Sequence, residues 1–202
     1  MSKATYLVGI YQQAVAELTK SKEQWKSLLE VMARYYKYSF DNNVLIYAQR
    51  PNAGLLADHD VWNKKIGRYI NKGAKGIAVI NMNNPTATLK YLFDMSDTNG
   101  DNESFTRVLN SVWKLEKHYK PSLIKAFGQL YGTDTPSIET CLHDLVAKRI
   151  ESQLPQYMEN FRIVNKDSIL YDLPIDAVKE QFIKLVRDSV GYMVLKRCGL
   201  NR

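Results

Sequence analysis

The stretch Ile66-Gly-Arg-Tyr-Ile-Asn-Lys-Gly-Ala-Lys-Gly-Ile-Ala-Val79 decides the fold class of this chain. Two short runs rich in β-branched and aromatic residues, 68–71 and 77–80, flank the five-residue segment Lys72-Gly-Ala-Lys-Gly76. Such runs favour strands, and a five-residue connection with two glycines is typical of a hairpin loop. The stretch therefore predicts a β-hairpin with two lysines near its tip.

Helical periodicity precedes this hairpin. Apolar residues at three- and four-residue intervals form one stripe, which places Tyr36 in the core. Ser39 or Asp41 is positioned to cap a later helix that Pro51 ends, and Gly67 is positioned to follow another. Helices are predicted over Thr5–Leu18, from Trp25 to Tyr36, over Asn42–Gln49 and from Asp58 to Ile66.

A third strand is predicted over Leu89–Met95, and the pattern becomes helical again from Phe105. Ser137 is expected to cap a helix that Pro155 interrupts, and Pro174 to open the last helix. The fold class is thus α+β: N-terminal helices with a small antiparallel sheet, followed by a helical bundle. We expect a basic α+β unit over residues 1–104 and a helical extension over residues 105–202 packed on it.

Composition and cysteine content narrow the protein class. The chain has 202 residues, 45% of them hydrophobic, and no apolar run approaches the roughly 18 residues of a membrane span. The first residues lack the basic start and apolar core of a signal peptide. Two cysteines without a spacing pattern, Cys141 and Cys198, suit buried thiols in a reducing cytoplasm. A cytoplasmic protein that does not enter a membrane is expected.

The positive charge is concentrated in one block. Residues 31–90 hold nine Lys or Arg against three Asp, which is +6 of the total net charge of +7. Residues 61–90 contain no acid, whereas the last 112 residues hold fifteen charges of each sign. This asymmetry is typical of a surface that binds a polyanion, although a solvated surface without a partner has the same composition.

The sequence has no recognised catalytic or metal-binding pattern. Its three histidines lie in different segments, and none has the spacing of a zinc ligand. The segment Lys72–Gly76 lacks the length and the Lys-Ser/Thr ending of a phosphate-binding loop, and no nucleophile elbow occurs. Asp58 and Asp60 are explained by helix capping. No cofactor, no metal and no enzymatic activity are expected.

Single-stranded nucleic acid is the polyanion that the side chains fit best. Binding a single strand requires cations along the phosphate backbone and flat rings on which bases stack. Phe40 is a further candidate ring. The predicted binding residues are Tyr38, Arg50, Trp62, Lys64, Lys65, Arg68, Tyr69, Lys72 and Lys75.

Several of these residues also have structural interpretations, which the sequence leaves open. Trp62 is either a stacking platform or part of the core, and the side of the strand that Tyr69 occupies is undecided. Arg50 either contacts DNA or bonds the last carbonyls of its own helix. The segment 94–98 forms either contacts or a turn network. Lys72 and Lys75 have the weakest structural interpretation, because a loop rarely buries lysine.

Four blocks in this order resemble the N-terminal domain of ArdC-type antirestriction proteins. They are Asn43-Val-Leu-Ile-Tyr-Ala-Gln-Arg-Pro51, Trp62, Ile66–Val79 and Phe93-Asp-Met-Ser-Asp-Thr98. Later segments, Trp113-Lys-Leu-Glu116 and 189–199, are similar to large helicase-like proteins of conjugative elements. The resemblance implies sequence-tolerant binding of single-stranded DNA during transfer or maintenance of a mobile genetic element. It also implies other domains of a larger helicase-like protein as partners.

Two departures from the family are visible. The zinc ligands of the metallopeptidase-like domain of ArdC proteins have no counterpart here, and Ala74 replaces an acidic residue of the predicted hairpin. Two other functions stay open. The basic block is also suited to a protein-interaction module that recruits or inhibits a DNA-processing enzyme. An enzyme fragment, such as a relic of a nuclease or deaminase, is the third interpretation.

Overall fold

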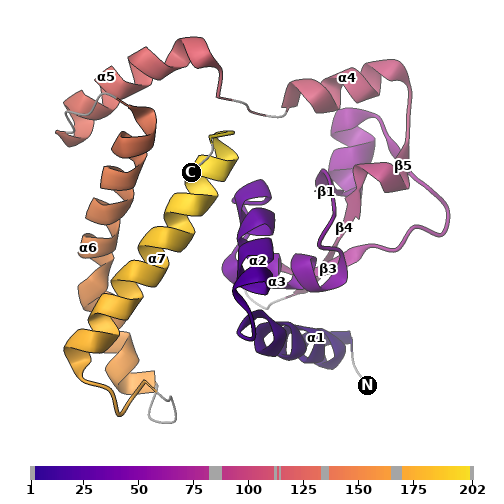
Figure 1. The fold of residues 1–202 in the computed structure, drawn as a ribbon. Helices are drawn as coiled ribbons and strands as arrows, with labels where there is room; N and C mark the ends of the chain where they lie inside the picture. Colours follow the sequence, from indigo (N-terminus) through magenta and orange to yellow (C-terminus); the bar gives the residue numbers. More distant parts are fainter. Residues whose placement is uncertain are drawn as a thin grey trace. The chain divides into compact units, whose positions relative to one another are not determined.

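The computed structural model describes residues 3–81, 88–111, 113, 115–132, 137–164 and 170–200. The fold class is mixed α+β, as predicted: helices lie at both ends of the chain, and the strands form two small antiparallel sheets (Figure 1). The chain forms two compact units, residues 1–113 and 114–202. The division therefore falls after Trp113, and the helix that spans the predicted boundary at residue 104 belongs to the first unit.

The first unit begins with three helices, and Ser39 and Gly67 lie at the ends of helical elements, as predicted. Ser39 Oγ accepts a hydrogen bond from the backbone N–H of Asn42 at 3.3 Å, which caps the third helix. Gly67 adopts a left-handed backbone conformation with φ of 79° where a helical turn ends. The helical elements of this unit are α1 (Lys3–Leu18), α2 (Lys22–Arg34), α3 (Phe40–Gln49), the π-helical turn η1 (Val61–Ile66), the 3-10 turn η2 (Met95–Asp97) and α4 (Asn102–Ser111).

The strands form a three-stranded sheet in the order β1-β4-β3 and a separate pair, β2-β5. One face of the larger sheet carries Ile77, Val79 and Leu92, which pack against Val31 of α2 and Ile46 of α3. The short strand β1 had no counterpart in the sequence prediction. The strands are β1 (Leu56–Asp58), β2 (Tyr69–Ile70), β3 (Ile77–Asn81), β4 (Thr88–Asp94) and β5 (Thr98–Asn99).

The prediction that Tyr36 lies in the core is wrong, since its side chain is exposed. Helix α2 ends at Arg34, so the helical spacing that placed Tyr36 on the apolar stripe no longer applies. The preceding ring, Tyr35, is buried instead. Its hydroxyl lies 2.6 Å from the carbonyl oxygen of Ala53 and 2.8 Å from that of Gly54.

The predicted hairpin between residues 68–71 and 77–80 is also wrong. Strand β2 pairs with β5, with Ile70 opposite Thr98, whereas β3 pairs with β4, with Ile77 opposite Leu92. The segment Lys72–Gly76 therefore connects two sheets and is not the tip of a two-stranded ribbon. In Figure 1 this connection leads into β3 as a wide arc.

Side-chain amides of α3 explain why β2 does not pair with β3. The amide of Gln49 donates to the carbonyl of Ala78 at 2.8 Å and accepts from its N–H at 3.0 Å. Asn42, two helical turns earlier, does the same with Ile80, both contacts at 2.8 Å. Strand β4 holds the other edge of β3. Because both edges of β3 are occupied, β2 finds its partner elsewhere.

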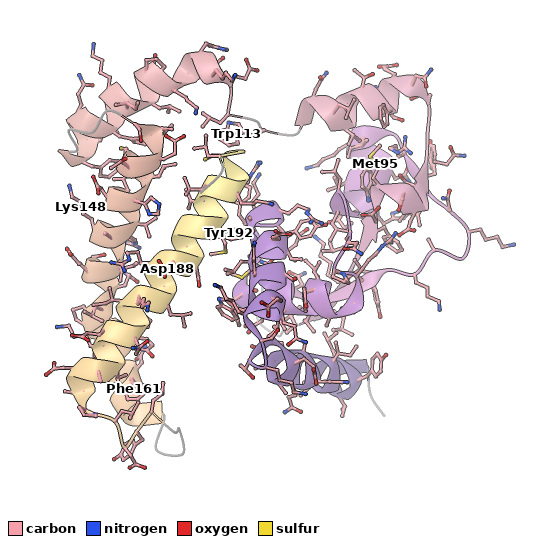
Figure 2. All side chains as sticks on the ribbon, viewed as in Figure 1. Met95, Trp113, Lys148, Phe161, Asp188 and Tyr192 are labelled. Carbon is pink, nitrogen blue, oxygen red and sulfur yellow. The ribbon has the colours of Figure 1, made fainter. Side chains whose placement is uncertain are left out.

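The second unit consists of helices, and α6 and α7 run antiparallel to each other (Figure 1). The ring of Tyr157 on α6 stacks on Phe182 of α7, and Gly191 of α7 lies against His143 of α6. Figure 2 labels Lys148 on α6, whose ammonium donates to the carbonyl of Tyr131 at 2.5 Å. The elements are the 3-10 turn η3 (Lys117–Tyr119), α5 (Lys120–Tyr131), α6 (Ile138–Val164) and α7 (Ile175–Arg197).

Two predictions about this unit have different outcomes. Ser137 Oγ accepts from the N–H of Thr140 at 3.2 Å, which confirms the predicted cap of α6. The predicted interruption at Pro155 is wrong, because α6 continues to Val164. One missing backbone donor is tolerated where packing along a second helix stabilises the segment. Among the described residues, none of the helices combines the length and apolar character needed to cross a bilayer.

Replacing Gln49 by alanine should destabilise the first unit. The substitution leaves the N–H and C=O of Ala78 without their partners at the edge of β3, and such a loss costs about 1–3 kcal/mol. We expect this decrease in the free energy of unfolding, measured by urea denaturation. The matched control is Gln13→Ala on the exposed face of α1, which should change stability by less than about 0.5 kcal/mol. Equal stability of the two variants would contradict the proposed role of the amide.

Candidate nucleic-acid interface

Arg50 lies in an internal network. Its guanidinium forms an ion pair with Asp97, donates to Ser96 Oγ at 2.9 Å and lies 4.0 Å from Asp94 Oδ1. This side chain was predicted either to contact DNA or to bond carbonyls of its own helix. The structure shows a third arrangement, in which the guanidinium joins the end of α3 to the turn after β4.

Asp94 is the centre of this network and is only 5% exposed. Its carboxylate accepts from the N–H of Ser96 at 2.9 Å, from Ser96 Oγ at 2.6 Å and from the N–H of Gly54. Burial alone would raise the pKa of Asp94, but these hydrogen bonds, together with the charge of Arg50, hold the pKa below its usual value. Asp94 and Ser96 therefore form a turn network, one of the two interpretations that the sequence left open.

Trp62 and Arg68 are buried, so neither is available to a ligand. The Trp62 ring is 1% exposed, and its Nε1 donates to the carbonyl of Phe93 at 2.9 Å. Arg68 is 8% exposed; its Nε donates to Thr98 Oγ1 at 2.8 Å and its Nη2 to the Thr98 carbonyl at 2.9 Å. The prediction that they bind DNA is wrong, because the ring fills the core and the guanidinium joins β2 to β5.

Two further candidates have partners within the unit. Tyr38 is half-buried against the core and meets the Tyr35 ring edge-on, with centroids 6.4 Å apart, and burial raises the pKa of its hydroxyl. It is therefore not an open stacking platform. Lys64 lies 3.2 Å from Asp60 in an exposed ion pair. Exposed pairs of this kind contribute little free energy, but the Asp60 carboxylate balances the charge of Lys64 locally.

Besides Lys64, four predicted residues are exposed: Lys65, Tyr69, Lys72 and Lys75. Tyr69 is 64% exposed on β2. Within the part of the chain that the structure describes, the three lysines have no carboxylate partner and no other polar contact. Lys65 lies on η1. Lys72 and Lys75 lie on the connection between the two sheets, residues 71–76, which we call the basic loop.

The structure adds two rings that the sequence did not single out. Tyr91 is 40% exposed and Phe93 is partly exposed; both are on the face of β4 opposite to Leu92 and the core. A side chain at Gly76 would meet the Phe93 ring and the Tyr91 Cβ at 3.0 Å. The basic loop therefore ends directly against these rings. Period-two alternation along residues 89–93 was the available signal for them.

No group of three His, Cys, Asp or Glu side chains in the described ranges is arranged to hold a metal ion. The chain matches no protein-family model, no curated protein and no solved structure. The chemistry of the exposed loop is therefore the basis for the function that we propose.

Substitution of Arg68 should lower the stability of the first unit. Arg68→Ala removes two hydrogen bonds to Thr98 and leaves a buried carbonyl without its donor, at a cost of about 1–3 kcal/mol. Lys72→Ala is the control, because this side chain is exposed and has no partner among the described residues. Thermal unfolding should show a lower Tm for Arg68→Ala alone. An unchanged Tm for both variants would contradict the structural role of Arg68.

Asp94 should make stability depend on pH. Because its pKa is lower in the folded protein than the usual 3.8, its contribution to stability is complete above that value and is lost as the pH falls through the folded-state pKa. Asp94→Asn should cost about 1–3 kcal/mol at pH 7, and this difference from the unsubstituted protein should shrink below pH 4. Urea denaturation at pH 7, 5 and 3.5 measures it. A difference that stays constant or grows at acid pH would rule out the low pKa.

Proposed function

We propose that the first unit binds single-stranded DNA without strong sequence preference, through the basic loop, Lys65 and Tyr69. The observation that carries this proposal is the contrast between two groups of cations. Arg50, Lys64 and Lys90 of the same unit each lie within ion-pair distance of a carboxylate. Lys65, Lys72 and Lys75, within eleven consecutive residues, have no such partner among the described residues.

Phosphate groups are suitable partners for these lysines. An ammonium at a mobile side-chain end neutralises a phosphate and releases condensed counterions, without reading the base attached to it. The left-handed backbone of Gly73, with φ of 87°, turns the chain between Lys72 and Lys75. A DNA strand bound in this way is recognised by the charge of its phosphates. Binding is therefore expected to tolerate different base sequences.

The exposed Tyr69 ring supports a single strand over a duplex as the ligand. A base stacks on an aromatic side chain only when its face is free, and such stacking is worth about 1–3 kcal/mol per base. The resemblance to ArdC-type N-terminal domains supports the same ligand and suggests a cytoplasmic role in transfer or maintenance of a mobile element. The other domains of a helicase-like protein are the partners that this role implies.

Salt dependence tests the proposal. Removing two phosphate contacts from a single strand lowers the slope of log affinity against log salt by about 1.4. We therefore expect Lys72→Ala with Lys75→Ala to weaken binding of oligo-dT and of mixed sequences alike, and to reduce the slope by this amount. The measurement is fluorescence anisotropy of labelled single-stranded DNA, duplex DNA and RNA at several salt concentrations.

The matched control removes the same charge elsewhere in the unit. Lys22→Ala with Lys37→Ala replaces two exposed lysines at the start of α2 and after its end. The control pair should retain most of the affinity and the full slope. If the two double variants lose affinity equally, the basic loop is not the binding site. A protein that prefers duplex over oligo-dT would overturn the assignment of a single strand as the ligand.

A further inference from the structure

The three-stranded sheet has a second face, which does not belong to the core. Alternation along the paired strands places Ala78 and Ile80 of β3 beside Leu89, Tyr91 and Phe93 of β4 on this outer face. None of the five residues is fully buried, and none belongs to the cluster that packs against α2 and α3. The outer face is therefore an apolar surface with two aromatic rings.

The two ends of the outer face differ. At one end, Gly76 lies against Phe93 and Tyr91, so the basic loop joins the face directly. At the other end, Ile80 and Leu89 line a groove of about 280 Å³ together with residues of α1 and α3. The wall that α1 contributes includes Val8, whose side chain is 54% exposed.

We propose that this outer face receives the bases of the single strand whose phosphates the basic loop holds, and that the groove beneath α1 takes a base at the end of the path. The proposal rests on the proposed function and extends it to a defined path. Aromatic rings on a sheet face provide stacking platforms, and the lysines at the adjoining loop provide the complementary charge. A groove of this size and apolar lining accommodates a flat ring.

The length of the face suits several nucleotides. Phe93 follows Leu89 by four residue steps along β4, which is about 14 Å at the rise of an antiparallel strand. Stacked nucleotides are spaced by about 3.4 Å, so the face matches about four of them. An oligonucleotide confined to the basic loop and the rings is therefore shorter than one that also reaches the groove.

Charge at the groove favours a base over a phosphate. Asp41 contributes to the lining, and its carboxylate accepts a hydrogen bond from the Tyr11 hydroxyl at 2.7 Å. A negative charge there repels the sugar–phosphate backbone, whereas the lysines lie at the other end of the face. We therefore expect the bound DNA to place its sugar–phosphate backbone at the basic loop and to insert a base between α1 and the sheet.

The first test separates stacking from charge. Tyr91→Ala should weaken oligo-dT binding by about 5- to 150-fold at fixed salt, which corresponds to the loss of one stacked base, and should leave the salt slope unchanged. Tyr91→Phe, which keeps the ring, should retain the affinity. The control is Tyr6→Ala, an exposed ring of α1 that does not line the groove. A loss in Tyr91→Phe as large as in Tyr91→Ala would overturn the stacking role.

The second test concerns the groove. Val8→Trp fills the groove from its exposed wall, so it should weaken binding of an oligo-dT of about ten nucleotides and leave one of about four nucleotides unaffected. Ultraviolet crosslinking of the unsubstituted protein does not depend on how the variants fold. Crosslinks to oligo-dT are expected on the tryptic peptides 91–107 and 4–20. Crosslinks confined to other peptides would overturn the path.

The outcomes separate the two proposals. If the Lys72 and Lys75 double variant changes the salt slope while Tyr91→Ala and Val8→Trp bind like the unsubstituted protein, the outer face is not the base-binding surface and the basic loop stands. If none of the variants changes binding, both proposals fall. The assignment of bases to the outer face would also be overturned if that face bound a protein ligand and not the bases of oligo-dT.

Discussion

The hydrogen bonds between the α3 amides and β3 are the constraint on which the first unit depends. Gln49 and Asn42 each satisfy both backbone groups of one β3 residue, so an edge that would otherwise stay open is closed by a helix. With β4 on its other side, β3 accepts no further strand. Strand β2 must therefore pair with β5, and the chain between β2 and β3 must cross from one sheet to the other. The exposed position of the basic loop is a consequence of this closed edge.

The blocks that carry the resemblance to ArdC-type domains are mostly structural in this protein. The Asn43 amide donates to the carbonyl of Tyr38 just before α3, and the Gln49 amide bonds the edge of β3. Arg50, together with Asp94, joins α3 to the turn after β4. Trp62 and Arg68 connect η1 and β2 to the β4–β5 region. Apart from Asn43, which contacts Tyr38 nearby in the sequence, these side chains meet partners 29 to 47 residues away along the chain. In this protein these blocks therefore build the frame of the first unit, and the ligand chemistry that we propose falls to exposed residues between them.

Local signals in the sequence were sufficient to predict the fold class and several ends of helices. They were not sufficient to predict which strands pair. Ser39, Gly67 and Ser137 act on residues within five positions, so their roles follow from sequence. The partner of β2 depends on amides about twenty residues earlier in the chain and on Thr98 about thirty residues later, and a local pattern contains neither. The same reason explains Trp62 and Arg68: their chemistry suits a ligand and an internal partner equally, and only the fold supplies the partner. Lys72 and Lys75 were predictable as exposed because a loop rarely buries lysine.

The basic loop is anchored at both of its ends, which matters for the ligand that we propose. At one end, Arg68 holds β2 to β5 through Thr98; at the other, Gly76 lies against Phe93 at the start of β3. Ordering a mobile loop on binding costs free energy, and this cost is smaller for a loop that is already anchored at both ends. The side chains of Lys72 and Lys75 are exposed, so in the function that we propose they are free to adjust to phosphates at varying positions. In the function that we propose, the anchored loop sets where the phosphates lie and the exposed side chains adjust to them, which suits a ligand with a regular backbone and variable bases.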